Sequence, residues 1–406
     1  MTFNSAIPEP KVTDDLDLII RSDADELLTR LQAHQRRIFA PSEKKEFRPL
    51  TSAETAKFAG IEESYLRKLM ATDRVPTPNV DADKKRLFSL DQLNEVRAIL
   101  EKGARGSSAK YLRRRTENDP LQVISVMNFK GGSGKTTTAI HLAQYLALRG
   151  YRVLAVDLDP QASLTAMLGY QPETQIGPDE TLMGAITYLG TPKETKEIIL
   201  STYIPGLHLI PAGLELMEFE HETPHHLALN KGADKKFFLR VGEAIDQVDA
   251  AYDVVIFDCP PQLGYLTLSA MAAATSTLIT IHPQMLDVMS MSQFLEMAAN
   301  LLEVIKAAGA STKSKWMRYL LTRYEPSDIP QQQMFGFLKS LFGDRVTNAT
   351  MLKSTMIADA GLTKKTLYEI DRSKVSRDTY GRAITAVDAV NAEIESLIRS
   401  AWGRQP

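Results

Sequence analysis

Residues 128–138, "NFKGGSGKTTT", have the composition of a phosphate-binding loop. Closely spaced glycines let backbone N–H groups wrap around phosphate oxygens, and a following lysine and hydroxyl contact the phosphates and Mg²⁺. The residues expected to bind the nucleotide are Gly131, Gly132, Ser133, Gly134, Lys135, Thr136 and Thr137. The usual pattern, G-x-x-x-x-G-K-[ST], has its first glycine where this chain has Phe129, and a second lysine, Lys130, follows at once. The question is what a nucleotide site does with two lysines.

Acidic residues end two apolar runs further along the chain. Asp157 and Asp159 lie in "AVDLDPQ", and Asp258 lies in "VVIFDCPP". Alone, an aspartate that ends a strand is more often a cap or a turn former. Close to a phosphate-binding loop, a carboxylate holds Mg²⁺ or its water ligands. We therefore expect Thr136, Asp157 and Asp258 to form the metal site.

Composition excludes several classes of protein. The 406 residues are too many for one ordinary core, so two or three domains are expected. A net charge of −2 means that any nucleic-acid contact must come from local patches. The single cysteine, Cys259, excludes a disulfide framework and a cysteine-rich cluster, and fits a reducing cytoplasm. The opening residues do not have the pattern of a secretory signal, and apolar runs stay shorter than a membrane span.

The chain divides into three predicted domains. Residues 119–406 alternate Val/Ile/Leu-rich runs with helical patterns, which predicts an α/β fold with a parallel sheet covered by helices. Ligands of such sheets bind at the carboxyl ends of the strands, where the loop and the aspartates lie. Residues 1–48 form a helical arm, either an intramolecular helix hairpin or a dimer contact. The C-terminal "NAEIESLIRSAWGRQP" has an apolar stripe whose polar face is not basic, which favours a packing helix over membrane attachment.

Residues 49–118 have the pattern of a winged helix-turn-helix domain with a basic linker. Thr51 and Glu54 form a capping box, and residues 62–70 are the expected reading helix. The DNA-contacting residues expected on this helix are Ser64, Tyr65, Arg67 and Lys68, and those at the tip of the wing are Lys84, Lys85 and Arg86. The linker "EKGARGSSAKYLRRR" is either a solvated charged segment or a further phosphate contact.

The double-lysine loop, the D-P-Q element and the D-C-P-P element together resemble the deviant Walker A family of ParA, MinD and the nitrogenase iron protein. The single cysteine excludes the iron protein. Three features resemble the long ParA type, most of all RepA of repABC replicons. They are the helix-turn-helix and the segments "LLTRYEPSD" and "NATMLKSTMIADAGLTKKTLYE". The resemblance implies ATP/ADP and Mg²⁺ as cofactors and a homodimer in which Lys130 reaches the partner's phosphates. It also implies that Asp159 orients the attacking water.

The implied function is segregation of a plasmid or replicon by a weak, Mg²⁺-dependent ATPase. The resemblance also implies that the protein is cytoplasmic and associated with the nucleoid. The ATP-bound dimer would bind nucleoid DNA non-specifically through Arg323 and Lys353, without a membrane contact. A ParB-type partner would stimulate hydrolysis. The N-terminal domain would bind operator DNA and repress its own operon. The alternative is a nucleotide-sensing transcriptional regulator without a direct transport role.

Overall fold

The computed structural model describes residues 16–38, 45–82, 84–104, 110–229 and 236–404 in two compact units. The first unit, Met1–Lys45, contains helix α1 (Leu16–Ile38), which confirms a helical N-terminal arm. The sequence places Ile20, Leu27, Leu31 and Ile38 on one helical stripe of this arm, and Ile20 and Leu27 are exposed on α1. The side chains of Leu31 and Ile38 lie outside the described part, and a dimer contact through α1 stays a prediction.

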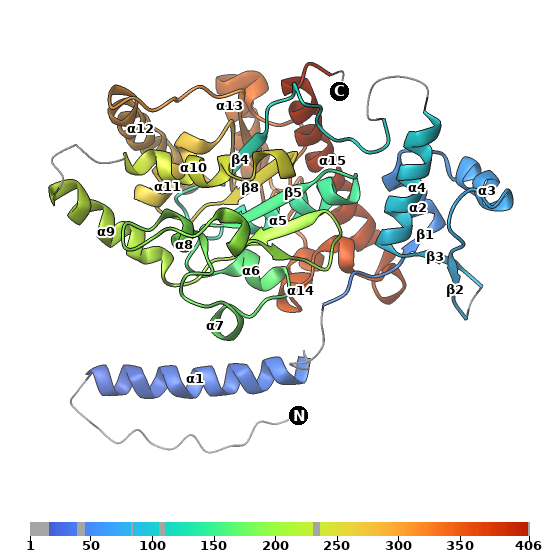
Figure 1. Cartoon of the computed structure of the whole chain (residues 1–406), viewed down its shortest axis with the longest axis horizontal. Coiled ribbons are helices and arrows are strands. Elements are labelled where there is room, and N and C mark those ends of the chain that lie inside the picture. The colour runs from blue at the N-terminus through green and yellow to red at the C-terminus, as the bar shows by residue number, and fades with distance from the viewer. Residues whose placement is uncertain (1–15, 39–44, 83, 105–109, 230–235, 405–406) are drawn as a thin grey trace. The chain divides into compact units, whose positions relative to one another are not determined.

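A seven-stranded sheet forms the centre of the second unit, Glu46–Pro406 (Figure 1). Its order is β10-β9-β4-β8-β5-β7-β6, and all neighbours are parallel except β6 and β7. The strands are β4 (Gln122–Met127), β5 (Val153–Asp157), β6 (Leu200–Ser201), β7 (Leu207–Ile210), β8 (Val254–Asp258), β9 (Ser276–Ile281) and β10 (Trp316–Leu321). The register pairs Asp157 with Asp258, so two predicted metal residues lie side by side at the carboxyl edge. The expected parallel sheet is confirmed.

Helices cover both faces of this sheet, and each face has its own apolar core. One core includes residues of α5 (Lys135–Leu148), α6 (Ser163–Met167) and α15 (Arg377–Ala401). The other includes residues of α8 (Leu182–Ile186), α9 (Leu216–Leu229), α10 (Arg240–Asp246), α11 (Tyr265–Ala273), α12 (Met285–Ala307) and α13 (Ile329–Phe342). Short helices α7 (Pro172–Gln175) and α14 (Thr355–Leu362) complete the set of α-helices described after β4. The C-terminal segment packs as expected, because Ile394 and Ile398 are fully buried.

The small domain at the start of the second unit has the predicted order of elements. Helix α2 (Ser52–Ala59) turns at Gly60 into α3 (Glu63–Ala71), and α4 (Leu90–Gly103) follows. A small antiparallel sheet accompanies them in the order β1-β3-β2, made of β1 (Leu50–Thr51), β2 (Asn79–Val80) and β3 (Arg86–Phe88). The capping box of Thr51 and Glu54 is present.

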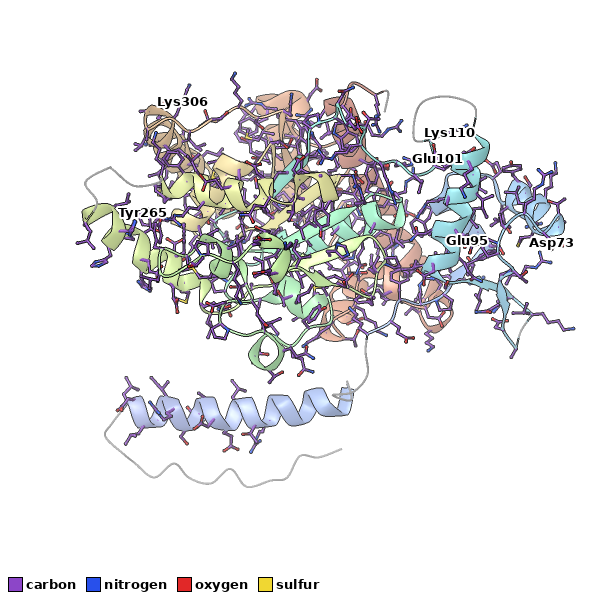
Figure 2. All side chains as sticks on the ribbon, viewed as in Figure 1. Asp73, Glu95, Glu101, Lys110, Tyr265 and Lys306 are labelled. Atoms are coloured by element: carbon purple, nitrogen blue, oxygen red, sulfur yellow. The ribbon has the colours of Figure 1, made fainter. Side chains whose placement is uncertain are left out.

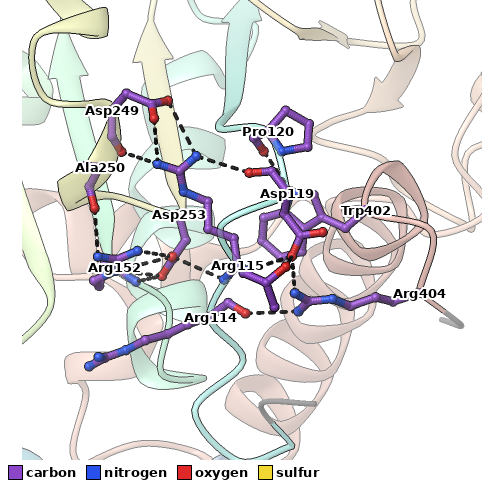
Figure 3. A network of polar contacts seen from close by, with 11 residues as sticks. Arg114, Arg115, Asp119, Pro120, Arg152, Asp249, Ala250, Asp253, Trp402 and Arg404 are labelled. Atoms are coloured by element: carbon purple, nitrogen blue, oxygen red, sulfur yellow. Dashed lines mark hydrogen bonds and ion pairs between the residues drawn. The ribbon is translucent and has the colours of Figure 1, made fainter. Parts of the chain in front are cut away.

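The basic linker between the two parts is held by carboxylates of the sheet domain. Arg113 forms an ion pair with Glu395 at 2.6 Å, and Arg115 forms one with Asp249 at 3.0 Å. Figure 3 shows that Arg115 lies in a larger network, in which its backbone N–H also donates to Asp253. Arg113 and Arg115 are therefore neither solvated nor free for phosphate, in contrast to both expectations for the linker.

Candidate nucleotide site

The phosphate-binding loop connects β4 to α5, so the helix N-terminus points its N–H groups into the loop. Gly132 and Gly134 have φ angles of 75° and 84°, a left-handed conformation that side chains with a Cβ rarely adopt. The end of β10 braces the loop, because the hydroxyl of Thr322 donates to the carbonyl of Ser133 at 2.7 Å. The loop thus has the shape that phosphate binding requires.

Lys135 is the buried lysine of the loop. It is only 6% exposed, and its Nζ donates to the carbonyl of Lys130 at 3.3 Å. Burial lowers the pKa of Lys135, and the carboxylates of Asp258 and Asp159 oppose this shift. A desolvated ammonium fixed above the loop is suited to anionic phosphates.

The carboxylates of Asp157 and Asp258 are fully buried at the ends of β5 and β8. Asp157 accepts hydrogen bonds from the backbone and hydroxyl of Thr165, both at 2.8 Å. Asp258 has no hydrogen bond of normal geometry from any residue that the structure describes. Burial and the charge of Asp157 raise the pKa of Asp258, whereas Thr136 and Lys135 oppose the rise.

An orphaned buried carboxylate beside a threonine hydroxyl fits a divalent cation. Within the described residues, no cluster of three or more His, Cys, Asp or Glu side chains could hold a metal unaided. A magnesium ion would therefore take phosphate oxygens and water as its remaining ligands. Asp258 and Thr136 are the residues that would hold it, with Asp157 next to Asp258 on the neighbouring strand.

A cavity of about 650 Å³ opens in front of the loop and has the size of a small-molecule site. Its lining includes residues 131–137, Asp159, Pro261 and a segment that leads into α14, residues 351–355. Asp159 accepts a hydrogen bond from the backbone of Gln161 at 3.0 Å, which orients its carboxylate. The cavity thus brings the loop and Asp159 together in one place.

Lys130 points to a different partner from Lys135. Its side chain is 46% exposed, and its ammonium forms an ion pair with the buried carboxylate of Asp287 on α12. His282 also approaches Asp287, with 3.4 Å between Nδ1 and Oδ2. The residue before Lys130, Phe129, stacks on Phe294 of α12 with 5.9 Å between ring centroids. The first turns of α12 therefore hold the ammonium of Lys130 away from the rest of its own loop.

Comparisons with known proteins identify the family. Residues 121–308 match the AAA domain family AAA_31. The chain is 53% identical to "Putative replication protein A" of Rhizobium rhizogenes over 98% of this chain and 99% of that protein. It is 33% identical to the chromosome-partitioning ATPase Soj of Thermus thermophilus over 66% of this chain and 95% of that protein. The chain belongs to the ParA family of ATPases. It is also 29% identical to SopA of Escherichia coli strain K12 over 89% of this chain and 92% of that protein.

Solved structures agree on the fold of this ParA-family chain. A structure titled "Partition Protein" aligns with a TM-score of 0.63 at 16% identity over 93% of this chain and 98% of that chain. An ATP complex of a variant of Cyanothece McdA aligns with a TM-score of 0.54 at 20% identity over 71% and 99% of the two chains. None of the described helices is long and apolar enough to cross a bilayer.

The residues predicted to contact DNA lie in two places. Those of α3 and the wing, namely Ser64, Tyr65, Arg67, Lys68, Lys84, Lys85 and Arg86, are all exposed. Arg67 forms an exposed ion pair with Glu63 at 2.7 Å. Arg323 and Lys353 instead line the nucleotide cavity. The guanidinium of Arg323 donates to the carbonyl of Gly132 at 3.3 Å, and Lys353 pairs with Glu325 at 2.7 Å.

Sequence reasoning missed the residues that support the loop from other strands. Thr322 and Thr280 contact Ser133, and Asp287 holds Lys130. The position of Thr280 near the end of β9, and of Thr322 just after β10, was the available signal, because strand ends of a parallel sheet converge on the ligand. Asp287 gave no such signal, since it lies inside the first turns of a methionine-rich helix.

Proposed function

We propose that this protein is a replicon-partition ATPase that binds ATP with Mg²⁺ and hydrolyses it slowly. The observation that carries the proposal is the loop with Lys135 buried at the phosphate position and Lys130 turned away from it. Soj of Thermus thermophilus, a relative named as a chromosome-partitioning ATPase and covered over 95% of its length, supports the same activity. ATP, ADP and Mg²⁺ are the cofactors that the cavity, Thr136 and Asp258 would accept.

Mg²⁺ supplies charge neutralisation of the phosphates when it is bound. Asp159 would orient the attacking water, and Lys135 would hold the β- and γ-phosphate oxygens. Lys130, once released from Asp287, would approach the nucleotide of a second copy of the chain. The site would then be complete only in a homodimer, so hydrolysis would require both ATP and association.

DNA contacts would come from two separate surfaces. The exposed side chains of α3 and the wing would bind the operator and allow repression of the chain's own operon. Arg323 and Lys353 would contribute to non-specific binding of nucleoid DNA by the ATP-bound dimer. Because both cations also line the nucleotide cavity, we expect this binding to depend on the nucleotide. A ParB-type partner bound at a centromere would accelerate hydrolysis and release the protein from DNA.

The deciding experiment measures oligomeric state and binding to random duplex DNA with ATP, with ADP and without nucleotide. Partition predicts a dimer that binds every sequence in the presence of ATP alone. The alternative, a nucleotide-sensing transcriptional regulator, predicts operator binding without ATP-dependent binding to random DNA.

A salt series then tests the proposed cations. Each phosphate contact contributes about 0.9 to the slope of log affinity against log salt, so Arg323→Ala in both subunits should flatten the slope by roughly 2. Lys353→Ala in both subunits should flatten the slope by the same amount. An unchanged slope in both variants would place the non-specific contact elsewhere.

A further inference from the structure

The loop that follows Asp258 connects the metal site to helix α11. It runs from Cys259 to Gly264, and Pro261 within it lines the nucleotide cavity. Its first residue is tied to the sheet, because the N–H of Cys259 donates to the carbonyl of Val126 at 3.2 Å. Pro260 and Pro261 have no N–H to donate. The position of the loop therefore depends on how its far end is fixed.

The far end is fixed by a carboxylate from another helix. Gly264 is the N-cap residue of α11 and has no side chain with which to cap it. Instead, Glu220 of α9 accepts hydrogen bonds from the backbone N–H of Tyr265 at 2.8 Å and of Leu266 at 3.0 Å. Figure 2 labels Tyr265 beside α9. A carboxylate at a helix N-terminus is favoured both by charge-assisted hydrogen bonds and by the helix dipole.

Glu220 and Gly264 form a matched pair. A Cβ atom added at Gly264 would lie 2.3 Å from Oε1 of Glu220, which is far inside van der Waals contact. A side chain at position 264 would therefore push the carboxylate away from its present position on the two N–H groups. The loop is also tied near this end by the hydroxyl of Thr267, which donates to the carbonyl of Gln262 at 2.7 Å.

We propose that Glu220 is a positioning residue for ATP hydrolysis, which deepens the proposed function and rests on it. By capping α11 from α9, it fixes the far end of the loop that carries Pro261 into the cavity and continues from Asp258. Glu220 itself does not line the cavity and touches no reacting group. Loss of the cap lets the loop shift, and small displacements around a reacting centre reduce turnover far more than they reduce binding of the whole nucleotide.

The test compares Glu220→Ala and Gly264→Ala with the wild-type chain. Both variants should keep ATP affinity within about 2-fold and lower ATP turnover by roughly 10-fold or more. The double variant should lose little beyond either single variant, because both changes remove the same contact. Glu220→Gln, which keeps one acceptor oxygen, should recover part of the turnover. Glu218→Ala, which removes an exposed carboxylate of the same helix, should match the wild type.

Hydrogen exchange supplies a readout that does not need hydrolysis. Amides 259 and 262–266 should exchange faster in Glu220→Ala, and Mg²⁺·ATP should protect them less than in the wild type. A wild-type chain that binds ATP without turnover would end the proposed function, and the exchange result would still decide the role of Glu220. Folded Glu220→Ala with wild-type turnover and wild-type protection by Mg²⁺·ATP would overturn the proposal. If Glu220→Ala does not fold, Gly264→Ala decides it by the same measurements.

Discussion

At the scale of single residues, two lysines of one loop have opposite environments. Lys135 is 6% exposed and lies over its own loop, whereas the side chain of Lys130 is 46% exposed and pairs with Asp287. Leaving the buried carboxylate of Asp287 costs more than breaking an exposed ion pair, but a half-exposed ammonium can change partners because water and other anions reach it. A buried ammonium cannot, because it has few alternative ligands. The difference in burial therefore assigns the fixed role to Lys135 and the movable role to Lys130.

Replacing Lys135 and replacing Lys130 should have different effects on nucleotide binding and dimerisation. Lys135→Ala should weaken nucleotide binding by the single chain, because it removes a desolvated cation from the phosphates. Lys130→Ala should leave that binding intact and abolish ATP-dependent dimerisation or the hydrolysis coupled to it. Asp287→Asn should favour the dimer by more than the roughly 5-fold per subunit expected of an exposed pair, since it removes the buried carboxylate that holds Lys130. Nucleotide titration and analytical ultracentrifugation measure both effects, and equal loss of nucleotide affinity in both lysine variants would contradict this assignment.

Asp159 gives a second prediction at this scale. It lines the cavity while Asp157 and Asp258 lie buried beneath, so its role should be in hydrolysis. Asp159→Ala should bind ATP and remain on DNA, with hydrolysis reduced by roughly 100-fold or more. Single-turnover measurement of phosphate release is the assay. Undiminished turnover in the presence of the partner would remove Asp159 from the mechanism.

The parts of the site that were predictable are those with a local pattern. Glycine spacing specifies the loop, and an aspartate at the end of an apolar run specifies a strand-edge carboxylate. Asp287 has no comparable pattern. Thr280 and Thr322 have only their positions at strand ends, because their contacts depend on which strands become neighbours. Arg323 and Lys353 show the same limit, since the sequence could not reveal that both line the nucleotide cavity.

At the scale of elements, helix α5 connects the phosphate-binding loop to the small domain. It has 14 residues, so it spans roughly 21 Å. Its N-terminus belongs to the phosphate-binding loop. Just beyond its C-terminus, Arg149 donates to the carbonyl of Lys57 in α2 at 3.2 Å. His141, fully buried on α5, accepts from the backbone of Leu367 at 3.2 Å and so ties the helix to the segment that also receives the small domain.

Helix α3 carries the element-scale prediction. Leu66 and Leu69 are buried, and Arg67 and Lys68 are exposed, so replacing either cation should not disturb the core. Arg67→Ala or Lys68→Ala should weaken operator binding by roughly 1–3 kcal/mol if the side chain reads a base and leave ATP hydrolysis unchanged. Lys306→Ala on α12 is the control for loss of an exposed charge. Operator protection by a fragment that starts near residue 119 would contradict the assignment.

Long periodic or apolar segments were predictable as elements, whereas their surroundings were not. The strands that end in Asp157 and Asp258 and the terminal packing helix are all confirmed. The methionine-rich segment "MLDVMSMSQFLEM" has a helical pattern that does not tell a core helix from a partner surface; it is a helix, and Met285 and Met289 are 63% and 59% exposed on it. Strands β6 and β7 could not be predicted, because runs of two and four residues carry too little periodicity.

At the scale of the second unit, the small domain is attached to the sheet domain by ion pairs and by a shared apolar core. Lys57 pairs with Asp388 at 2.5 Å, and Arg48 donates to the carbonyl of Tyr368 at 2.9 Å. Arg113 and Arg149 share the buried carboxylate of Glu395. Burial alone would raise the pKa of Glu395, but these cations outweigh it and lower the pKa. From these contacts we expect the small domain to move together with α5.

Arg113 and its neighbour Arg114 provide a matched test of this attachment. Arg113→Ala leaves the Glu395 carboxylate with fewer donors, which should destabilise the chain by roughly 1–3 kcal/mol. It should also reduce the difference in operator affinity between the ATP-bound and nucleotide-free protein, because the link to α5 is weakened. Arg114→Ala removes the same charge from an exposed side chain and should leave both quantities unchanged. Thermal unfolding and operator titrations with and without ATP measure them.

The Arg113 and Arg114 variants also distinguish a linker that attaches the small domain from a linker that contacts DNA. If the linker grips phosphate, Arg114→Ala is the variant that should weaken binding to every DNA sequence, because its side chain is exposed whereas that of Arg113 is 20% exposed and paired. If the linker only anchors the small domain, Arg113→Ala alone should change DNA binding, and it should do so through the nucleotide dependence of operator binding. A uniform loss of affinity in Arg114→Ala with an intact response to ATP would therefore show that the linker is a DNA contact after all.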